Sequence, residues 1–267
     1  MPSFTPPTAS GDSGDAGNLT VRTLDGIATI QFGHPKGNSL PGSLLRRMAE
    51  SIDVVGADPS ARVIVLRSGG TPGGPFCAGA SFEELRRIAD AAAGKEFFMG
   101  FGRLILAMRR CPKFIIARVH GKAVGGGVGV VAAADYAIAS PGALVRLSEL
   151  AVGIGPFVVG PVIQRKIGRG AFQALAVDAA NWRDAAWAER HGLFAQVAGE
   201  GDALDAAVSG LAHALAKSSP EAMARMKETF WQGTESWEEL LDARAAMSGA
   251  LVLSDYTRSA IAAFAAR

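Results

Sequence analysis

Short apolar segments alternate with segments of helical spacing along most of this 267-residue sequence, and this alternation limits the possible folds more than any other feature. Residues 62–67 and 114–119 are short apolar runs, as expected for strands that are covered on both faces. One helix face between them is indicated by the spacing of Phe97, Phe101, Leu104 and Met108. Alternating elements of this kind predict an α/β core.

A hairpin is expected near the start of the chain. Residues 18–24 and 27–32 have the composition of strands, and Asp25-Gly26 between them suits the positive backbone angles of a tight turn. Residues 1–17 are rich in Pro, Ser, Gly and Asp, which predicts a disordered tail. From about residue 200 onward strand patterns stop, so we expect an α/β core at 18–200 and a helical region at 201–267.

Composition excludes several classes of function. With 49% hydrophobic and 19% charged residues, the chain can bury a sizeable core and is not disordered throughout. The 27 basic and 25 acidic residues nearly balance, which predicts no nucleic-acid partner and no membrane surface. The apolar stretches are interrupted before the ~20 residues that span a bilayer. The 2 cysteines and 4 scattered histidines give no zinc-ligand spacing. We therefore expect a cytoplasmic protein without a bound metal.

Three groups among the 33 glycines stand where a strand should pass into a helix, at 69–79, 121–129 and 153–160. Glycines in this position let backbone N–H groups approach a ligand, and the start of a helix adds the positive end of its dipole. Gly121-Lys122 lacks the spacing of a phosphate-binding loop, and no dinucleotide fingerprint is present. Two interpretations remain. The glycines permit tight turns and close packing, or the first two groups form an oxyanion hole.

Six segments share their order and spacing with one known family. They are NSL at 38–40, FCAGA at 76–80, VHGKAVGGG at 119–127, AADYAIA at 133–139, SELAVGI at 148–154 and ERHGL at 189–193. Together they resemble the crotonase (enoyl-CoA hydratase/isomerase) superfamily over about residues 19 to 265. The resemblance implies an α/β fold built as a spiral of repeated β-β-α units, with a C-terminal helical trimerisation region. It also implies a homotrimer, or a hexamer built as a dimer of trimers.

The resemblance further implies a site and a substrate. At matching positions, the N–H groups of Ala80 and Gly126 would hold the thioester carbonyl of an acyl-CoA, in agreement with the oxyanion interpretation. Glu149 would be the acid/base, and its apolar neighbours predict a raised pKa. CoA arrives with the substrate, so no separate cofactor is expected. The residues expected to contact substrate are Leu40, Ala78, Ser81, Phe82, Gly125 and Gly129.

One position departs from the family pattern. Hydratases of the family usually use two glutamates, and the first should stand where this chain has Gly129. A single carboxylate is sufficient to move a proton between C2 and C4 of an acyl chain, as in Δ3,Δ2-enoyl-CoA isomerases. The whole chain nevertheless resembles proteins called enoyl-CoA or methylglutaconyl-CoA hydratases, which favours hydration or dehydration of a 2-enoyl-CoA, with isomerisation as the alternative. If the missing carboxylate limits hydration, glutamate at position 129 should raise it.

A crotonase-fold protein that binds acyl-CoA or RNA without catalysis is a further alternative. The retained Glu149 argues against binding alone, and the even charge balance argues against RNA. Cys77 lies beside the proposed oxyanion hole but has no histidine near it in sequence, which argues against thiol catalysis. Contact with CoA phosphates is conceivable for three basic side chains, although a solvated basic face explains them more simply: Lys36, Arg86 and Arg87.

Overall fold

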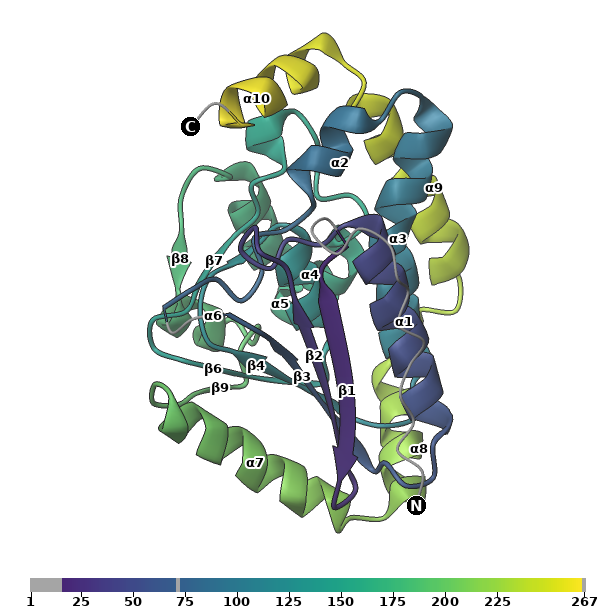
Figure 1. Cartoon of the computed structure of the whole chain (residues 1–267), viewed down its shortest axis with the longest axis vertical. Coiled ribbons are helices and arrows are strands. Elements are labelled where there is room, and N and C mark those ends of the chain that lie inside the picture. Colours follow the sequence, from purple (N-terminus) through teal and green to yellow (C-terminus); the bar gives the residue numbers. More distant parts are fainter. Residues whose placement is uncertain (1–15, 71–72, 266–267) are drawn as a thin grey trace.

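The computed structural model describes residues 16–70 and 73–265, with side chains up to residue 263. Strands and helices alternate as far as β9 (Gln196–Val197), and the four elements that follow it are all helices (Figure 1). The alternation of strands and helices agrees with the expectation from the sequence, and the division into a core at 18–200 and a helical region at 201–267 stays a prediction. Nearly all of the expected disordered tail at 1–17 lies outside the described residues.

The main sheet has six strands in the order β1-β2-β3-β4-β6-β9. β1 (Asn18–Leu24) and β2 (Ile27–Gly33) form the expected antiparallel hairpin, in which Leu24 pairs with Ile27 across the turn. The remaining neighbours pair in parallel. Their bounds are β3 (Val63–Ser68), β4 (Ile115–Val119) and β6 (Tyr136–Ala139).

A second, shorter ladder runs beside the main sheet. It contains β5 (Ala123–Val124), β7 (Leu144–Arg146) and β8 (Arg183–Asp184). Two isolated bridges extend it, between Leu40 and Ala80 and between Cys77 and Ala123. Successive turns of the chain thus supply one strand to the main sheet, one short segment to this ladder and then a helix. This is the spiral of β-β-α units that the sequence predicts.

Helices cover both faces of the main sheet because β3 and β4 present apolar side chains on both sides. Ile64 and Leu66 belong to the larger core, together with residues of α1 (Gly42–Ala57), α3 (Ala91–Arg110) and α4 (Gly126–Ala133). Val63 and Val65 point the other way, where α7 (Asp202–Ala216) covers them with its buried residues Leu204, Val208 and Ala212. Figure 1 shows α7 along the opposite side of the sheet from α1 and α3.

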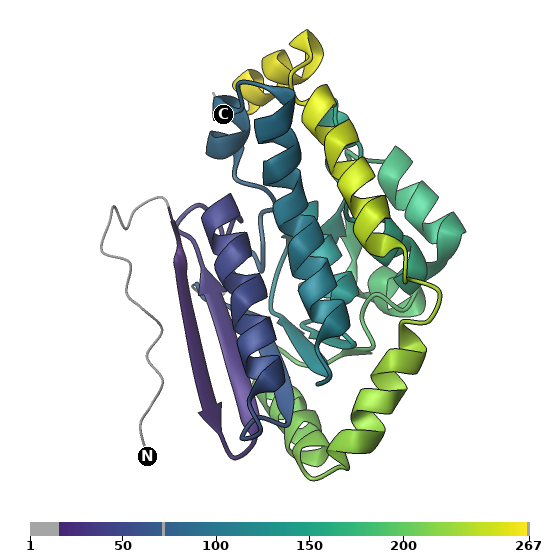
Figure 2. The ribbon, with the colours of Figure 1, turned by 90° about the vertical axis from the view of Figure 1, so that its right-hand side faces the viewer.

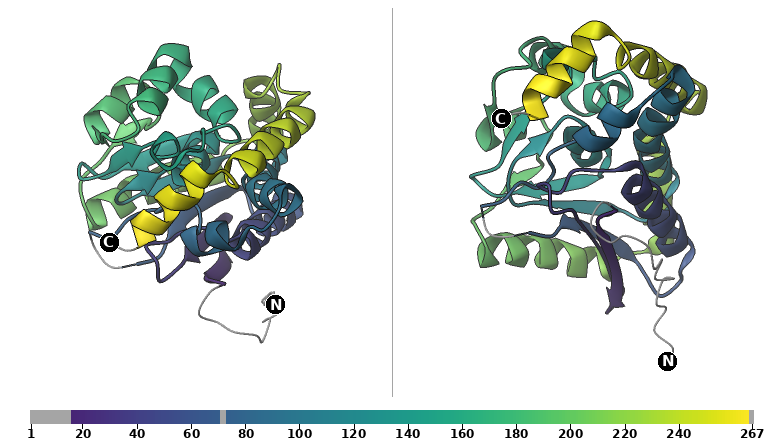
Figure 3. Two further views of the ribbon diagram at one scale, coloured as in Figure 1. Left: turned by 90° about the horizontal axis from the view of Figure 1, so that it is seen from above. Right: turned by 45° about the horizontal axis from the view of Figure 1, so that its top comes forward.

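The last three helices pack on the chain that carries them: α8 (Pro220–Phe230), α9 (Trp237–Leu251) and α10 (Asp255–Ala265). α9 lies along α3 (Figure 2), and a Cβ added to Gly249 at their crossing would overlap the backbone of Gly94 and Lys95. α10 crosses next to α2 (Phe82–Arg87) (Figure 3). Met247, Leu251 and Tyr256 remain exposed in this region, so a partner copy could cover them. The trimer or hexamer stays a prediction.

The elements not yet placed are α5 (Gly160–Val177), α6 (Ala185–Arg190) and a short 3-10 helix, η1 (Leu150–Val152). Within the described residues, no helix combines the length and the apolar character needed to cross a membrane.

Candidate active site

The loop after β3 is held between two neighbouring segments by backbone hydrogen bonds. On one side, Leu40 N donates to Gly79 O at 2.8 Å. On the other side, Cys77 N donates to Lys122 O at 3.0 Å, and Val124 N donates to Cys77 O at 2.9 Å. The first and second glycine loops are thereby paired directly, in a register fixed by hydrogen bonds on both sides.

This pairing brings Ala80 and Gly126 to the wall of one cavity. Gly126 is the first residue of α4, where a backbone N–H has no acceptor within the helix. Among the described residues, no backbone acceptor is found for the N–H of Ala80. A Cβ added to Gly79 would lie 4.0 Å from Gly126 N, so the two loops are in contact. The arrangement offers two unused N–H donors from separate loops, as an oxyanion hole requires.

Gly125 and Gly126 have no room for a side chain. Gly125 has a φ of 52°, and a Cβ there would lie 3.0 Å from Glu149 Oε1. A Cβ at Gly126 would overlap the ring of Phe101, which is itself buried. Close packing thus applies to both glycines. Gly125 N donates to Arg146 O at 2.9 Å, so of these two residues Gly126 is the one whose N–H has no backbone acceptor within the described part of the chain.

Glu149 places its carboxyl group beside Gly125, on the wall of the same cavity. Its Oε2 is shielded from solvent and has no hydrogen-bond partner among the described residues. Burial raises the pKa of this carboxyl from 4.5 to about 7, because the charged form loses its hydration. A group with this pKa can both accept and return a proton near neutral pH.

The backbone around Glu149 is supported by the C-terminal helix α10. Glu149 immediately precedes η1, and its carbonyl accepts a hydrogen bond from Ile154 N at 2.9 Å. Gly153 ends this turn, and a Cβ there would overlap Thr257 of α10, which is fully buried. The position of the carboxylate therefore depends on a segment more than a hundred residues further along the chain.

The cavity is small and mostly apolar. Its volume is about 60 Å³, compared with the roughly 10–15 Å³ that one water molecule needs. Four aromatic rings contribute to its wall: Phe82, Phe98, Phe101 and Phe157. Among the described residues of the wall, Glu149 is the one titratable side chain. The site can thus hold a small apolar group next to a single proton carrier.

Of the remaining residues expected to contact substrate, Ala78, Phe82 and Gly125 line the cavity. Leu40, Ser81 and Gly129 are not part of its wall, and their contact with a substrate stays a prediction. Leu40 is fully buried in the core and contributes its backbone to the second ladder. Ser81 accepts a hydrogen bond from Glu84 N at 3.3 Å and caps α2.

Gly129 faces Val159 instead of the cavity. A Cβ at this position would lie 2.5 Å from Val159 Cγ1 and 2.7 Å from Val159 Cβ, which is closer than packed carbon atoms approach. Val159 is buried and does line the cavity. The place where the family carries its first glutamate is therefore filled by a valine side chain from another segment.

The loop before α1 is fixed by Asn38, which belongs to the NSL segment. Its Nδ2 donates to Gly69 O at 2.7 Å and to Pro75 O at 2.9 Å, and its Oδ1 accepts from His34 N at 3.1 Å. These bonds tie the first glycine loop to the segment that carries Leu40. The role of this signature residue in the structure is to hold the loop.

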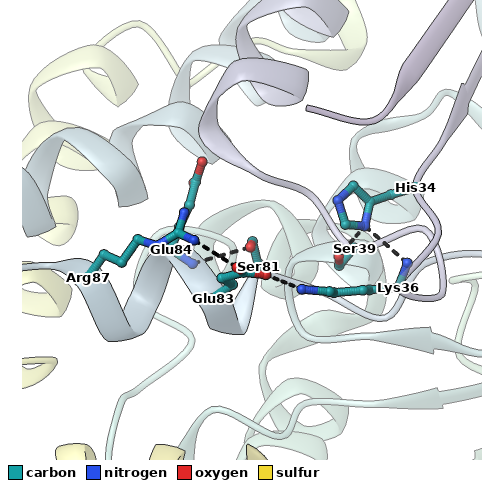
Figure 4. Close-up of polar contacts among 7 residues, drawn as sticks. All are labelled: His34, Lys36, Ser39, Ser81, Glu83, Glu84 and Arg87. Atoms are coloured by element: carbon teal, nitrogen blue, oxygen red, sulfur yellow. Dashed lines mark hydrogen bonds and ion pairs between the residues drawn. The ribbon is translucent and has the colours of Figure 1, made fainter. Parts of the chain in front are cut away.

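The basic side chains near α2 pair with Glu83 or line a neighbouring depression, and Arg87 does both. Lys36 and Arg87 both pair with Glu83, the latter at 2.7 Å (Figure 4). Arg86 and Arg258 instead line, with Arg87, a depression of about 480 Å³ between α2 and α10. Leu85 belongs to the walls of both this depression and the cavity, so the two are adjacent. For Lys36, Arg86 and Arg87, contact with CoA phosphates and a solvated basic face both remain open.

Cys77 is fully buried, and burial raises the pKa of its thiol to about 12. Its Sγ accepts a weak hydrogen bond from Gly79 N at 3.4 Å. The thiolate is the reactive form of cysteine, and this side chain stays protonated near neutral pH. The structure agrees with the sequence in giving Cys77 no nucleophilic role.

Residues 22–267 match the family described as enoyl-CoA hydratase/isomerase. The chain belongs to this family. A relative from Thermus thermophilus, described as a candidate enoyl-CoA hydratase, is 28% identical over 76% of this chain and 79% of its own length. Human mitochondrial methylglutaconyl-CoA hydratase is 30% identical over 81% of this chain and 66% of its own length.

Solved structures of enoyl-CoA hydratases show the same fold. One from Mycobacterium avium subsp. paratuberculosis has a TM-score of 0.81 and 23% sequence identity, and the match covers 93% of this chain and 96% of that one. The crotonase fold predicted from the six sequence segments is thereby confirmed.

Some wall residues of this enoyl-CoA hydratase/isomerase family member had no recognisable signal in the sequence. Val159 lies within the third glycine group, but nothing in its surroundings in the sequence indicates contact with Gly129. Ser248 lies on α9 and is buried at the cavity wall. Phe98 is adjacent to the apolar stripe of α3 and could have been included by extending that stripe. No cluster of His, Cys, Asp or Glu that could hold a metal is found among the described residues.

Proposed function

We propose that the chain is an acyl-CoA enzyme that moves one proton through an enolate, and that its best-supported reaction is the shift of a double bond from C3 to C2. The observation that carries this proposal is the filling of the space at Gly129 by Val159. It leaves Glu149 as the one proton carrier among the described wall residues. The sequence favoured hydration, but hydration needs a group that activates water as well as one that protonates carbon.

The proposed mechanism uses Glu149 in both of its protonation states. The carboxylate removes a proton from C2 of a 3-enoyl thioester, and the electron pair moves to the thioester oxygen. The N–H groups of Ala80 and Gly126 donate hydrogen bonds to that oxygen, and one such donor is typically worth about 3 kcal/mol. The protonated Glu149 then returns the proton to C4, which gives the conjugated 2-enoyl thioester. No proton is gained or lost overall.

The pKa of Glu149 predicts the pH dependence of this reaction. Removal of the C2 proton needs the carboxylate, so kcat/KM for a 3-enoyl-CoA should rise with pH through about 7 instead of about 4.5. Because the native pKa is raised, the folded state also loses stability as pH rises from about 4.5 to about 7. The initial rate, measured at subsaturating substrate from pH 5 to pH 9, tests the predicted rise of kcat/KM with pH. A profile that is flat down to pH 5 would contradict it.

Hydration of a 2-enoyl-CoA is the second candidate, supported by the family and by the names of the relatives. If a missing glutamate limits hydration, Gly129→Glu alone does not supply it, because the new Cβ would collide with Val159. We expect this variant to have a lower Tm and no gain of hydration. Gly129→Glu with Val159→Gly removes both close contacts and should show measurable hydration. If the single variant is stable and hydrates substrate, the steric argument is wrong.

The two candidates are separated by incubating the protein with matched 2-enoyl- and 3-enoyl-CoA thioesters and following the products by mass and chromatography. The proposal expects conversion of the 3-enoyl thioester to its 2-enoyl isomer without the added mass of water. A product heavier by one water would identify a hydratase. Acyl-CoA binding without conversion of any thioester would favour the non-catalytic alternative and contradict both reactions.

A further inference from the structure

Among the residues that the structure describes, none in the cavity wall offers a positive charge to an acyl group. Its described side chains are aromatic and aliphatic, apart from the hydroxyls of Ser148 and Ser248 and the carboxyl of Glu149. Serine hydroxyls can hydrogen-bond a neutral polar substituent, but they do not balance a full charge. Arginines do line the adjacent depression between α2 and α10, which shares Leu85 with the cavity.

From this distribution of charge, and resting on the proposed function, we infer that the enzyme acts on acyl groups without a charge and discriminates against acyl groups with a second carboxylate. A carboxylate carried into the cavity would lose its hydration without gaining a cationic partner. It would also lie in the same small space as Glu149, whose Oε2 is already shielded from solvent and unpartnered. Two carboxylates so close in an apolar site disfavour each other's charged forms.

Two saturated thioesters of equal chain length test this inference without any turnover. Valeryl-CoA and glutaryl-CoA each carry a five-carbon acyl group, and they differ by a terminal carboxylate. We expect glutaryl-CoA to bind about 100-fold more weakly in calorimetry with the full-length protein, since the cost of an unpaired buried carboxylate is at least a few kcal/mol. Dissociation constants within threefold of each other would overturn the inference while leaving the proposed function intact. No binding of either thioester would contradict both.

A variant with a positive charge in the cavity wall tests the same inference by raising the affinity for the charged thioester. Ser248→Lys adds a cation to the cavity wall and should narrow the difference between the two thioesters to about tenfold or less, because the added charge can pair with the terminal carboxylate. Gln173→Lys adds the same charge at an exposed position of α5 and should leave the 100-fold difference in place. If both variants narrow the difference in affinity between the two thioesters equally, the discrimination comes from the overall charge of the protein and not from the cavity, and the inference is wrong. If Ser248→Lys does not fold, the dissociation constants of valeryl-CoA and glutaryl-CoA with the wild-type protein still test the inference.

Discussion

Glu149→Gln is expected to lower kcat for a 3-enoyl-CoA about 1000-fold, within the usual range for loss of a positioned acid/base. Glutamine has nearly the same shape as glutamate but cannot exchange a proton with carbon. Because the oxyanion donors remain, the dissociation constant for a saturated acyl-CoA should change by less than about threefold. Single-turnover kinetics and calorimetry measure the two quantities separately.

A matched control for this variant is Glu239→Gln, which makes the same chemical change at an exposed position of α9. It should leave kcat unchanged. The variant at 149 removes a charge that is costly to bury, so it should not lower the Tm near neutral pH. Equal turnover by wild type and Glu149→Gln would show that another group carries the proton.

Gly126→Ala has the second largest expected effect. The added Cβ would overlap the ring of Phe101, so the start of α4 must move and take its N–H away from the thioester oxygen. Loss of one oxyanion donor typically lowers kcat by about 100- to 1000-fold. The rate with a 3-enoyl-CoA, compared with circular dichroism and Tm, distinguishes loss of the donor from loss of the fold.

Gly210→Ala in α7 is the appropriate comparison, because nothing lies within 4 Å of the added Cβ. It should be neutral or slightly stabilising, since alanine favours helix by about 1 kcal/mol over glycine. Combining Gly126→Ala with Phe101→Ala removes the overlap and should recover part of the lost rate. A Gly126→Ala protein with wild-type turnover would remove Gly126 from the mechanism.

The sequence predicted those parts of the site that depend on neighbouring residues. The turn at Asp25-Gly26 fixes the hairpin, and the glycine loops predict N–H donors within residues 77–80 and 125–127, which the family resemblance assigns to Ala80 and Gly126. Glu149 could be identified because its apolar neighbours and its motif are contiguous. For the hairpin the deciding interactions lie within a few residues along the chain, whereas the placement of Glu149 also depends on α10.

Contacts between segments that are distant in the sequence could not be predicted from local sequence patterns. Leu40 and Ser81 lie in loops that border the cavity, but sequence position does not show which side chains form its wall, and neither of these two does. The overlap of Val159 with the space at Gly129 depends on how the segment before α5 packs against α4. Ser248 reaches the wall only because α9 lies along α3.

The spiral places the chemical groups of the site at corresponding points of consecutive turns. Ala80 forms the bridge with Leu40 shortly before α2, Gly126 begins α4 shortly after β5, and Glu149 lies between β7 and η1. The proposed mechanism thus assigns binding of the thioester oxygen and transfer of the proton to different turns of the spiral. A substitution in one turn of the spiral can change the reaction without changing the binding of CoA thioesters. A family with this architecture can diversify its chemistry one turn at a time.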